Sequence, residues 1–283
     1  MGTAGESWPQ DAPMAPSLPM GEFVELVMTR GLERYRDLPW RNISDPYAVW
    51  ISEVMLQQTQ VTRVDGRWQH WMERFPSVDT LAAADSGDVL DEWQGMGYNR
   101  RALALLRAAR QIVAAGEFPK EERDLVALPG IGPATAAGIR AFAYNLPGVY
   151  LETNVRTVFL HELFPHETDV PDRALVPLVR ASCPEDLPRN WYYALLDYGA
   201  WLKKTVPNPS RRSRGHVRQS RFEGSHRQKR GEVVRMLLAA RADGVSVVDV
   251  TRALSVSESD ARALLSELAT EGFCTMRDSR WFV

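Results

Sequence analysis

The sequence predicts an all-α body over residues 21–204, followed by a basic linker at 205–227 and a small module at 228–283. Throughout the body, apolar residues recur at helical spacing, and short Gly or Pro breaks separate the helical stretches. Alternating strand-like segments are scarce in the same range. Beyond it, a stretch rich in turn formers and without periodicity marks a domain boundary.

The first 20 residues lack the features of a signal peptide. They hold four prolines and some acidic residues, with no basic start followed by an apolar core. We therefore expect a disordered leader at 1–20. No apolar run in the 283-residue chain approaches the roughly 18 residues of a membrane span, so we expect no membrane partner.

Helices are expected one after another along the chain, each from apolar residues at helical spacing. In the body they cover 23–32, 49–61, 81–93, 101–115, 121–128 and 132–144. In the C-terminal module we expect helices at 228–240, 247–254 and 258–271, and a hairpin within 273–283. Three helices and a terminal hairpin are typical of a winged-helix-like module, which can hold DNA or contact another protein.

Positive charge is concentrated near the linker, although the net charge of the whole chain is −2. Between Lys203 and Arg230, ten Lys or Arg residues stand against a single acid, Glu223. Such a run can bind phosphates and release counterions, whatever the balance of the whole chain. A solvated linker is the alternative interpretation.

A glycine-rich turn joins two of the expected helices. Residues 128–132 (LPGIG) end one helix, and the next begins at once. Gly130 and Gly132 let the backbone turn tightly, and the amides at the new helix start, with Thr135 nearby, form an anion site. A hairpin of this kind suits a DNA phosphate and carries no sequence information. An ordinary helical hairpin in a bundle is the alternative.

A carboxyl and several amides share the segment 50–61 (WISEVMLQQTQV). A lone acid in an apolar helix usually caps a helix or reaches solvent. Held among apolar neighbours such as Trp50, however, Glu53 would have a raised pKa and could act as a general acid. The amides of Gln57, Gln58 and Gln60 could fill the gap that a flipped base leaves and bond to its partner base.

A second carboxyl lies in the segment 150–158 (YLETNVRTV). Glu152 precedes a helix expected to begin near Thr153, where amides and the helix dipole favour an anion. An N-terminal helix charge without further role is one interpretation. The other is a fixed carboxylate opposite the positive charge of an oxocarbenium-like sugar.

Several motifs in fixed order carry a resemblance to a known family. They are LPWR at 38–41, DPY at 45–47, SEVMLQQTQV at 52–61, GMGY at 95–98 and LPGIG at 128–132. Together they resemble the adenine DNA glycosylase (MutY) family of the endonuclease III superfamily, over 38–200. The resemblance implies a helix-hairpin-helix glycosylase fold of two helical subdomains with the active site in the cleft between them. It also implies that Glu53 protonates the departing base, that Gln57 and Gln58 wedge into DNA, and that Tyr98 inserts beside the opposing base.

Two departures from the family pattern concern the chemistry. Glu152 stands where the superfamily has aspartate, and the extra methylene moves the carboxylate by about 1.5 Å. Misplacement by roughly 1 Å can cost about a hundredfold in rate, so the pocket has been rebuilt or the chemistry has changed. Tyr193 replaces the glutamine associated with adenine recognition, which removes a paired donor and acceptor.

Other departures concern cofactors and architecture. Ala134 stands where the lyase relatives carry a lysine nucleophile, so a monofunctional enzyme that uses water is expected. With only Cys183 and Cys274, the chain cannot supply the four thiolates of the family's iron–sulfur cluster, and no metal is expected. The basic linker is expected to take the place of the loop that holds the cluster in the family. The resemblance also implies that backbone carbonyls of the hairpin could bind a monovalent cation. The arginines expected to grip phosphates there are Arg211, Arg212, Arg214 and Arg218.

The sequence therefore predicts a monofunctional DNA glycosylase of base excision repair, acting as a monomer on double-stranded DNA with a lesion or mismatch, in the cytoplasm at the nucleoid. Its base pocket is expected to contain Arg41, Trp50, Tyr193 and Asp197. Two substrate classes stay open: adenine opposite 8-oxoguanine, or a uracil-type or oxidised pyrimidine such as 5-hydroxymethyluracil. The altered Glu152 and Tyr193 favour the second. A catalytically silent lesion-binding reader is the rival hypothesis.

Overall fold

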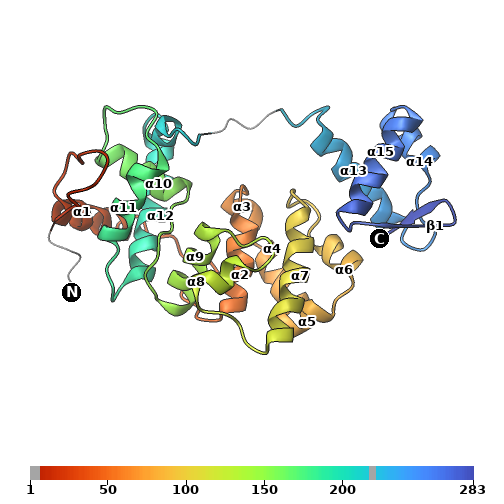
Figure 1. Cartoon of the computed structure of the whole chain (residues 1–283), viewed down its shortest axis with the longest axis horizontal. Coiled ribbons are helices and arrows are strands. Elements are labelled where there is room, and N and C mark those ends of the chain that lie inside the picture. Colours follow the sequence, from red (N-terminus) through yellow and green to blue (C-terminus); the bar gives the residue numbers. More distant parts are fainter. Residues whose placement is uncertain (1–6, 217–220) are drawn as a thin grey trace. The chain divides into compact units, whose positions relative to one another are not determined.

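The computed structural model describes residues 7–216 and 221–283. The chain divides into two compact units: unit 1 comprises residues 1–53 and 119–218, and unit 2 comprises 54–118 and 219–283. Helices make up nearly all of the regular structure in the described residues, and a two-stranded sheet completes it (Figure 1). The prediction of an all-α fold is confirmed. Within these residues, no helix has the length and apolar character needed to cross a bilayer.

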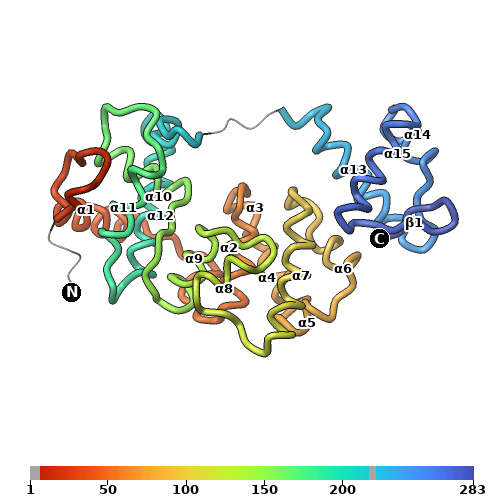
Figure 2. Tube along the Cα trace, viewed as in Figure 1, coloured from red at the N-terminus to blue at the C-terminus, as the bar shows by residue number. Residues whose placement is uncertain are grey.

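Unit 1 is built around the long helix α12. Its elements are α1 (Met20–Leu32), most of α2 (Pro46–Leu56), α8 (Glu122–Val126), α9 (Pro133–Tyr144), α10 (Thr153–Glu162), α11 (Asp172–Ser182), α12 (Pro188–Thr205) and the 3₁₀ helix η1 (Pro209–Arg212). Helices α10 and α12 lie side by side (Figure 2). A Cβ at Gly199 would lie within 3.0 Å of the Asn154 backbone, so this close approach requires glycine.

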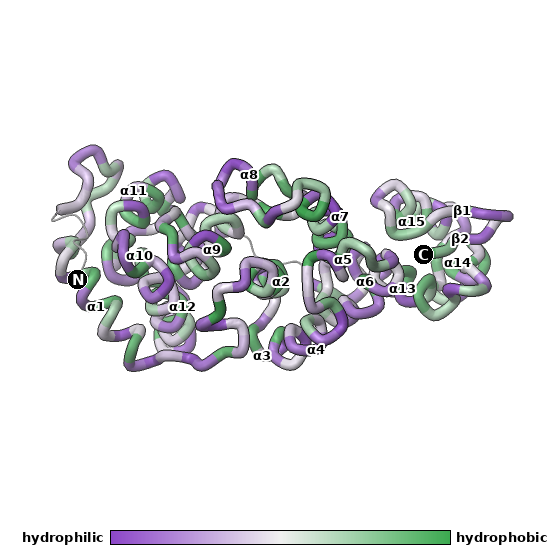
Figure 3. The backbone as a smooth tube through the Cα atoms, turned by 90° about the horizontal axis from the view of Figure 1, so that it is seen from below, coloured by the Kyte–Doolittle hydropathy of each residue, from purple (hydrophilic) through white to green (hydrophobic). Residues whose placement is uncertain are grey.

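Unit 2 holds two groups of helices. The first contains α3 (Val61–Val64), α4 (Arg67–Arg74), α5 (Val78–Ala83), α6 (Ser86–Glu92) and α7 (Arg100–Ala115). The second contains α13 (His226–Ala239), α14 (Val247–Leu254), α15 (Glu258–Thr270) and the hairpin of β1 (Thr275–Arg277) and β2 (Arg280–Phe282). Apolar residues recur along each helix among polar ones (Figure 3), which leaves one face of a helix to pack inward. The order of three helices and a hairpin agrees with the sequence prediction.

The expected disorder of the leader is wrong for residues 7–19. The Trp8 ring packs against Phe23 with 5.7 Å between ring centroids, and its Nε1 donates to the Leu18 carbonyl at 2.7 Å. The backbone amide of Ser17 donates to the Leu163 carbonyl at 3.0 Å. The apolar side chains among the prolines give this segment enough buried surface to order it, which prolines and charge alone do not reveal.

Two predicted helices are shorter than expected. The helix expected at 49–61 is α2, which ends at Leu56, so the amide-rich residues after it form a turn. The helix expected at 81–93 is split into α5 and α6. Ala84 is extended, and the Asp85 carboxylate accepts a hydrogen bond from the Gly87 amide as the N-cap of α6. A side chain that caps a new helix therefore interrupts an otherwise continuous apolar pattern.

The first part of the basic linker is also ordered. Pro209 and Ser210 are buried, and η1 packs against α10. Val170 donates to the Arg212 carbonyl and accepts from the Arg214 amide, both at 3.0 Å. The turn formers of this segment build a 3₁₀ helix, so the alternative of a solvated linker is wrong for this part. Residues 217–220 lie outside the described residues.

Candidate active site

The carboxyl of Glu53 is buried inside unit 1. Glu53 is only 8% exposed. Burial raises the pKa of this carboxyl to about 8; a hydrogen bond from the Tyr150 hydroxyl opposes the shift, and the charge of Glu152 adds to it. At neutral pH, Glu53 therefore holds a proton. The raised pKa expected from the sequence is confirmed, with burial as its main cause.

Two residues outside the predicted site, Gly138 and Tyr150, shape the space around Glu53. A Cβ at Gly138 of α9 would lie within 3.0 Å of Glu53 Oε2 and of the Tyr150 ring, so glycine leaves the space that the carboxyl occupies. Tyr150 itself is held by its neighbour Tyr192, whose hydroxyl accepts a hydrogen bond from the Tyr150 amide at 3.3 Å. These contacts orient the Tyr150 hydroxyl toward the acid.

The carboxylate of Glu152 caps helix α10, as the sequence predicted. Oε1 accepts hydrogen bonds from the backbone amides of Asn154 and Val155, the second at 3.0 Å. Burial raises the pKa of Glu152, while these amides and the positive charges of Lys203 and Arg156 oppose the shift. The two carboxyls therefore lie in different environments: backbone amides at a helix N-terminus favour the charged form of Glu152, whereas burial favours the protonated form of Glu53.

Lys203 lies on α12 near Glu152 and is partly buried. In the sequence, Lys203 is the first residue of the basic run that ends at Arg230. Burial lowers the pKa of its ammonium group, and the Glu152 charge counteracts this. Lys203 is four residues beyond Gly199, on the face of α12 that meets the start of α10. The positive charge of Lys203 therefore favours the charged form of Glu152, and both residues belong to unit 1.

Arg41 and Asp197 form a buried ion pair. Arg41 Nη1 and Nη2 donate to the two Asp197 oxygens at 2.7 and 2.8 Å, and the two side chains are 2% and 0% exposed. Arg36 also contacts Asp197, through its Nε and through its backbone amide at 3.1 Å. Both oxygens of Asp197 are engaged, so its place in unit 1 is to hold Arg41 and not to touch a base.

Arg41 in turn lies over the ring of Tyr193. Its guanidinium carbon is 4.5 Å from the ring centroid, and the same ring stacks on Phe142 at 4.9 Å with 6° between planes. Burial raises the pKa of Tyr193 to about 12, so it stays a neutral phenol. Its hydroxyl approaches the Asn42 amide but makes no well-aligned hydrogen bond to any described residue. The ring is covered by Phe142 and Arg41, and the hydroxyl is buried as well.

Trp50, the fourth residue expected in the base pocket, is 0% exposed. Its ring contacts Tyr47, with 6.3 Å between centroids. A base could not stack on a fully buried ring. Trp50 therefore belongs to the buried core and does not face an incoming base.

The expected hairpin joins α8 to α9. Gly130 has a φ of +80°, which favours glycine, and Gly132 is the N-cap of α9 with an extended backbone. Gly132 has no side chain to cap the amides of the first turn, and a Cβ added there would meet nothing within 4 Å. Thr135 is the third residue of α9 and is 8% exposed. The turn is suited to an anion that comes from outside the protein.

We expect Gly132→Ala to weaken binding to duplex DNA about tenfold without loss of stability. A methyl group on this open surface would keep a phosphate from the amides, and a hydrogen bond to a charged group contributes about 1.5 kcal/mol. Fluorescence anisotropy with a labelled duplex and a thermal melt measure the two quantities. Gly130→Ala is the control for strain, because its positive φ predicts lower thermal stability. Unchanged affinity for Gly132→Ala would remove the hairpin from the DNA surface.

The wedge residues expected from the sequence lie together in unit 2. Gln57 and Gln58 follow the end of α2, and Tyr98 precedes α7; both Gln58 and Tyr98 have positive φ values near 50°. Arg101 joins the two turns: its guanidinium donates to the Gln57 carbonyl at 2.7 Å and to the Gly97 carbonyl at 3.0 Å. Gln60 is the N-cap of α3. The sequence offered no sign that Arg101 organises these turns.

The arginines of the linker differ from one another. Arg212 donates to the carbonyls of Leu160, Phe164 and Glu167 at the end of α10, so the prediction that it grips phosphates is wrong. Arg214 pairs with Asp169 at 2.6 Å on the surface. Arg211 is exposed and remains a candidate phosphate contact. Arg218, a further expected contact, lies outside the described residues.

A buried carboxyl, a second carboxyl at a helix N-terminus and a glycine hairpin define the class, a helix-hairpin-helix protein equipped for acid–base chemistry. The model of the HhH-GPD superfamily of base excision DNA repair proteins matches residues 51–187. The adenine DNA glycosylase of Mycolicibacterium smegmatis is 34% identical, over 71% of this chain and 75% of that protein. That of Buchnera aphidicola is 38% identical, over 44% of this chain and 36% of that protein. The chain belongs to the HhH-GPD superfamily of base excision DNA repair proteins.

Solved structures share this fold. A thermostable thymine-DNA glycosylase superimposes with a TM-score of 0.57 over 64% of this chain and 86% of that one, at 22% identity. At this level of identity the likeness concerns the fold alone.

Proposed function

We propose that the chain is a monofunctional DNA glycosylase, which hydrolyses the N-glycosidic bond of a flipped base in duplex DNA. The observation that carries this proposal is the pairing of a protonated Glu53, with a pKa of about 8, and an amide-bound Glu152 carboxylate. Two carboxyls in environments that separate their protonation states are typical of enzymes that need an acid and an anion at the same time. Membership of a base excision repair family supports the same conclusion.

In the proposed reaction, Glu53 donates its proton to the departing base as the glycosidic bond breaks and its electron pair moves to the base. The sugar becomes an oxocarbenium-like cation, which the Glu152 carboxylate stabilises. Water then adds to the anomeric carbon, and the proton that it loses returns to Glu53. The products are the free base and an abasic site, and the enzyme is restored.

The same proposal covers cofactors, partner and location. Ala134 offers no amine to attack the sugar, so water is the nucleophile and no strand cleavage accompanies base release. We propose that the enzyme works without an iron–sulfur cluster, since Cys183 and Cys274 are only two and both are buried. Its proposed partner is lesion-containing double-stranded DNA, bound by a monomer at the cytoplasmic nucleoid.

For the substrate we propose a mispaired or damaged base other than adenine. The phenol of Tyr193 is buried with its ring against Phe142 and Arg41 and has a single hydroxyl, whereas adenine recognition needs a paired donor and acceptor. A uracil-type or oxidised pyrimidine such as 5-hydroxymethyluracil fits this chemistry. Adenine opposite 8-oxoguanine is the second candidate, because the mycobacterial relative named an adenine DNA glycosylase matches over 75% of its length.

The test is single-turnover base release from labelled duplexes, with and without alkali. The panel contains adenine opposite 8-oxoguanine or guanine, uracil, thymine and 5-hydroxymethyluracil opposite guanine, and hypoxanthine. We expect cleavage only after alkali, on a pyrimidine duplex, with loss of release in Glu53→Gln. Cleavage without alkali would contradict the monofunctional mechanism. Tight lesion binding without release on any duplex would make the chain a DNA reader.

A further inference from the structure

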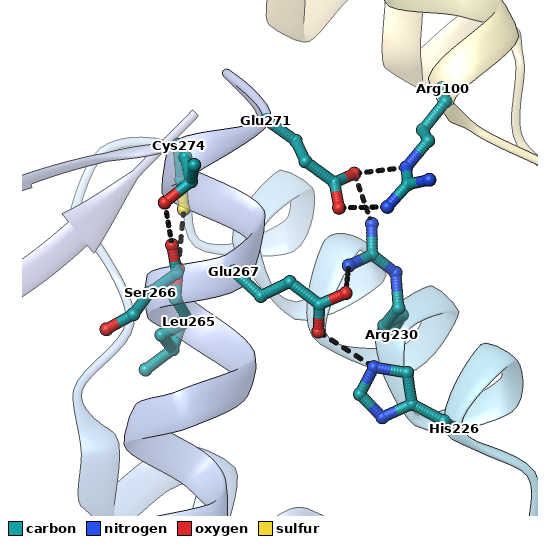
Figure 4. A network of polar contacts seen from close by, with 9 residues as sticks. Arg100, His226, Arg230, Leu265, Ser266, Glu267, Glu271 and Cys274 are labelled. Atoms are coloured by element: carbon teal, nitrogen blue, oxygen red, sulfur yellow. Dashed lines mark hydrogen bonds and ion pairs between the residues drawn. The ribbon is translucent and has the colours of Figure 1, made fainter.

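The C-terminal helices are fixed to α7 by a network of ion pairs within unit 2 (Figure 4). Arg230 of α13 bridges Glu267 and Glu271, at 2.6 and 2.5 Å. Glu271 also accepts from Arg100, the first residue of α7, at 2.6 Å. His226 contacts Glu267 at 2.7 Å. The carboxylates are thus neutralised by cations, and the start of α7 is joined to α13 and α15.

A second set of contacts lies at α6. Arg241 donates to Asp85 and to Asp88, both at 2.8 Å. A Cβ at Gly87 would lie within 3.0 Å of the Arg241 guanidinium, so glycine leaves room for this side chain. Two separate attachments hold the C-terminal helices against the helices of the glycosylase body in this unit.

An open cleft of about 890 Å³ lies beside the first of these attachments, since Arg100, Arg230 and Glu267 belong to its lining. Gln57, Gln58 and Tyr98 line it from the body, and Phe222, Arg227 and Arg230 line it from the C-terminal segment. The volume lies within the range of sites that take molecules the size of a base. The wedge residues predicted from the sequence therefore share a cleft with residues for which the sequence suggested no such role.

One cation and two exposed rings form the recognisable feature of this cleft. The Arg227 guanidinium lies 5.6 Å from the Tyr98 ring centroid and 5.3 Å from that of Phe222, and Nη1 donates to the Tyr98 hydroxyl at 3.1 Å. Phe222 is 54% exposed and Tyr98 is 36% exposed, so part of each ring is open to solvent. Exposed aromatic faces beside a guanidinium are typical of surfaces on which bases stack.

We propose that this cleft reads the base left opposite the excised one, and that Phe222 and Arg227 select guanine there. The proposal rests on the proposed glycosylase function and adds the C-terminal segment to its DNA surface. Stacking on Phe222 and Tyr98 would hold any base, since every base has an aromatic face. The planar fork of Arg227 matches the O6 and N7 acceptors of guanine, which gives selectivity. Neutralisation of Glu267 and Glu271 removes the charges that would repel DNA at this point.

The experiment measures equilibrium binding of the full chain to duplexes that carry a stable abasic analogue opposite a chosen base. The chosen bases are guanine and 7-deazaguanine, which lacks only the N7 acceptor. We expect the wild type to bind the guanine duplex about fivefold more tightly, as the loss of one hydrogen bond predicts. Arg227→Ala and Arg227→Lys should both reduce this ratio to about one, because lysine keeps the charge but not the fork.

Phe222→Ala should weaken binding about tenfold for either base, with the guanine preference retained. Two matched controls come from the same segment. Arg235→Ala removes an exposed arginine from α13, and Met276→Ala removes an apolar side chain that is 60% exposed on β1. Both should keep the wild-type affinity and ratio. Phe222, Arg235 and Met276 are exposed and Arg227 is half-buried, and thermal melts verify folding of all variants.

Binding and base release separate the two proposals. Three results would overturn the inference, even if base release is normal. The wild type could bind the guanine and 7-deazaguanine duplexes equally, or Arg227→Ala could keep the wild-type preference for guanine. The third is that Phe222→Ala binds DNA with the same affinity as Met276→Ala. A guanine preference that depends on Arg227, with no base release on any duplex, would support the cleft while it contradicts the glycosylase.

Discussion

Glu53→Gln is expected to reduce base release by about 10²–10⁴-fold and to stabilise the folded protein. Glutamine keeps the shape of the side chain and can still accept the Tyr150 hydrogen bond, but it has no proton to give to the leaving base. General acid catalysis of this kind contributes about that factor in rate. The same substitution removes a buried group whose charged form the pocket disfavours.

The pH dependence follows from the sign of the pKa shift. Glu53 has an ordinary pKa of 4.5 and about 8 in the folded state. The folded protein therefore holds more protons than the unfolded chain between these values, and its stability falls as the pH rises from about 4.5 to about 8. At pH 7 the raised pKa of Glu53 lowers the free energy of unfolding by an amount on the order of 3 kcal/mol. Base release by the wild type should also fall as the pH rises through about 8, because the acid loses its proton.

Denaturant unfolding at pH 5, 7 and 8.5, together with single-turnover rates, tests this prediction. The gain in stability of Glu53→Gln should be small at pH 5 and should grow toward pH 8.5. Glu25→Gln, on the exposed side of α1, is the matched control and should change neither quantity. A variant whose stability difference is constant with pH would show that Glu53 titrates as an ordinary exposed carboxyl.

Local sequence patterns predicted the helical fold and part of the site. Glu152 could be predicted because an N-cap position is set by the residues that follow it, and the hairpin because Gly130 and Gly132 impose a turn. Glu53 could be predicted because its helix is otherwise apolar. In each case, neighbours within a few positions determine the structure.

Contacts between distant segments could not be predicted in the same way. Gly138 and Lys203 reach the two carboxyls from other helices, and nothing in their own neighbourhoods indicates it. Tyr150 had a usable signal: in an extended segment, residues two apart lie on one side, so Tyr150 accompanies Glu152. Arg212 was misassigned because a run of arginines does not reveal which members cap carbonyls within the protein.

Asp197→Ala is expected to destabilise the protein by about 3–5 kcal/mol. It removes the partner of Arg41, whose side chain is 2% exposed, and leaves a buried guanidinium without its counter-ion. The substitution also removes the carboxylate that Arg36 contacts. Arg41 is then no longer held by Asp197 in its place over the Tyr193 ring. The expected loss is a large part of the stability of a typical domain.

Urea unfolding measures the change, and two further variants identify its cause. Asp172→Ala removes an exposed partner of Arg156, paired at 2.7 Å, and should cost less than about 1 kcal/mol. The double variant Arg41→Met with Asp197→Leu removes both buried charges, and it should recover much of the stability that Asp197→Ala loses. If Asp197→Ala costs no more than Asp172→Ala, the buried pair does not hold unit 1 together. If the double variant is less stable than Asp197→Ala, the cost comes from lost hydrogen bonds around Asp197, and not from the buried charge of Arg41.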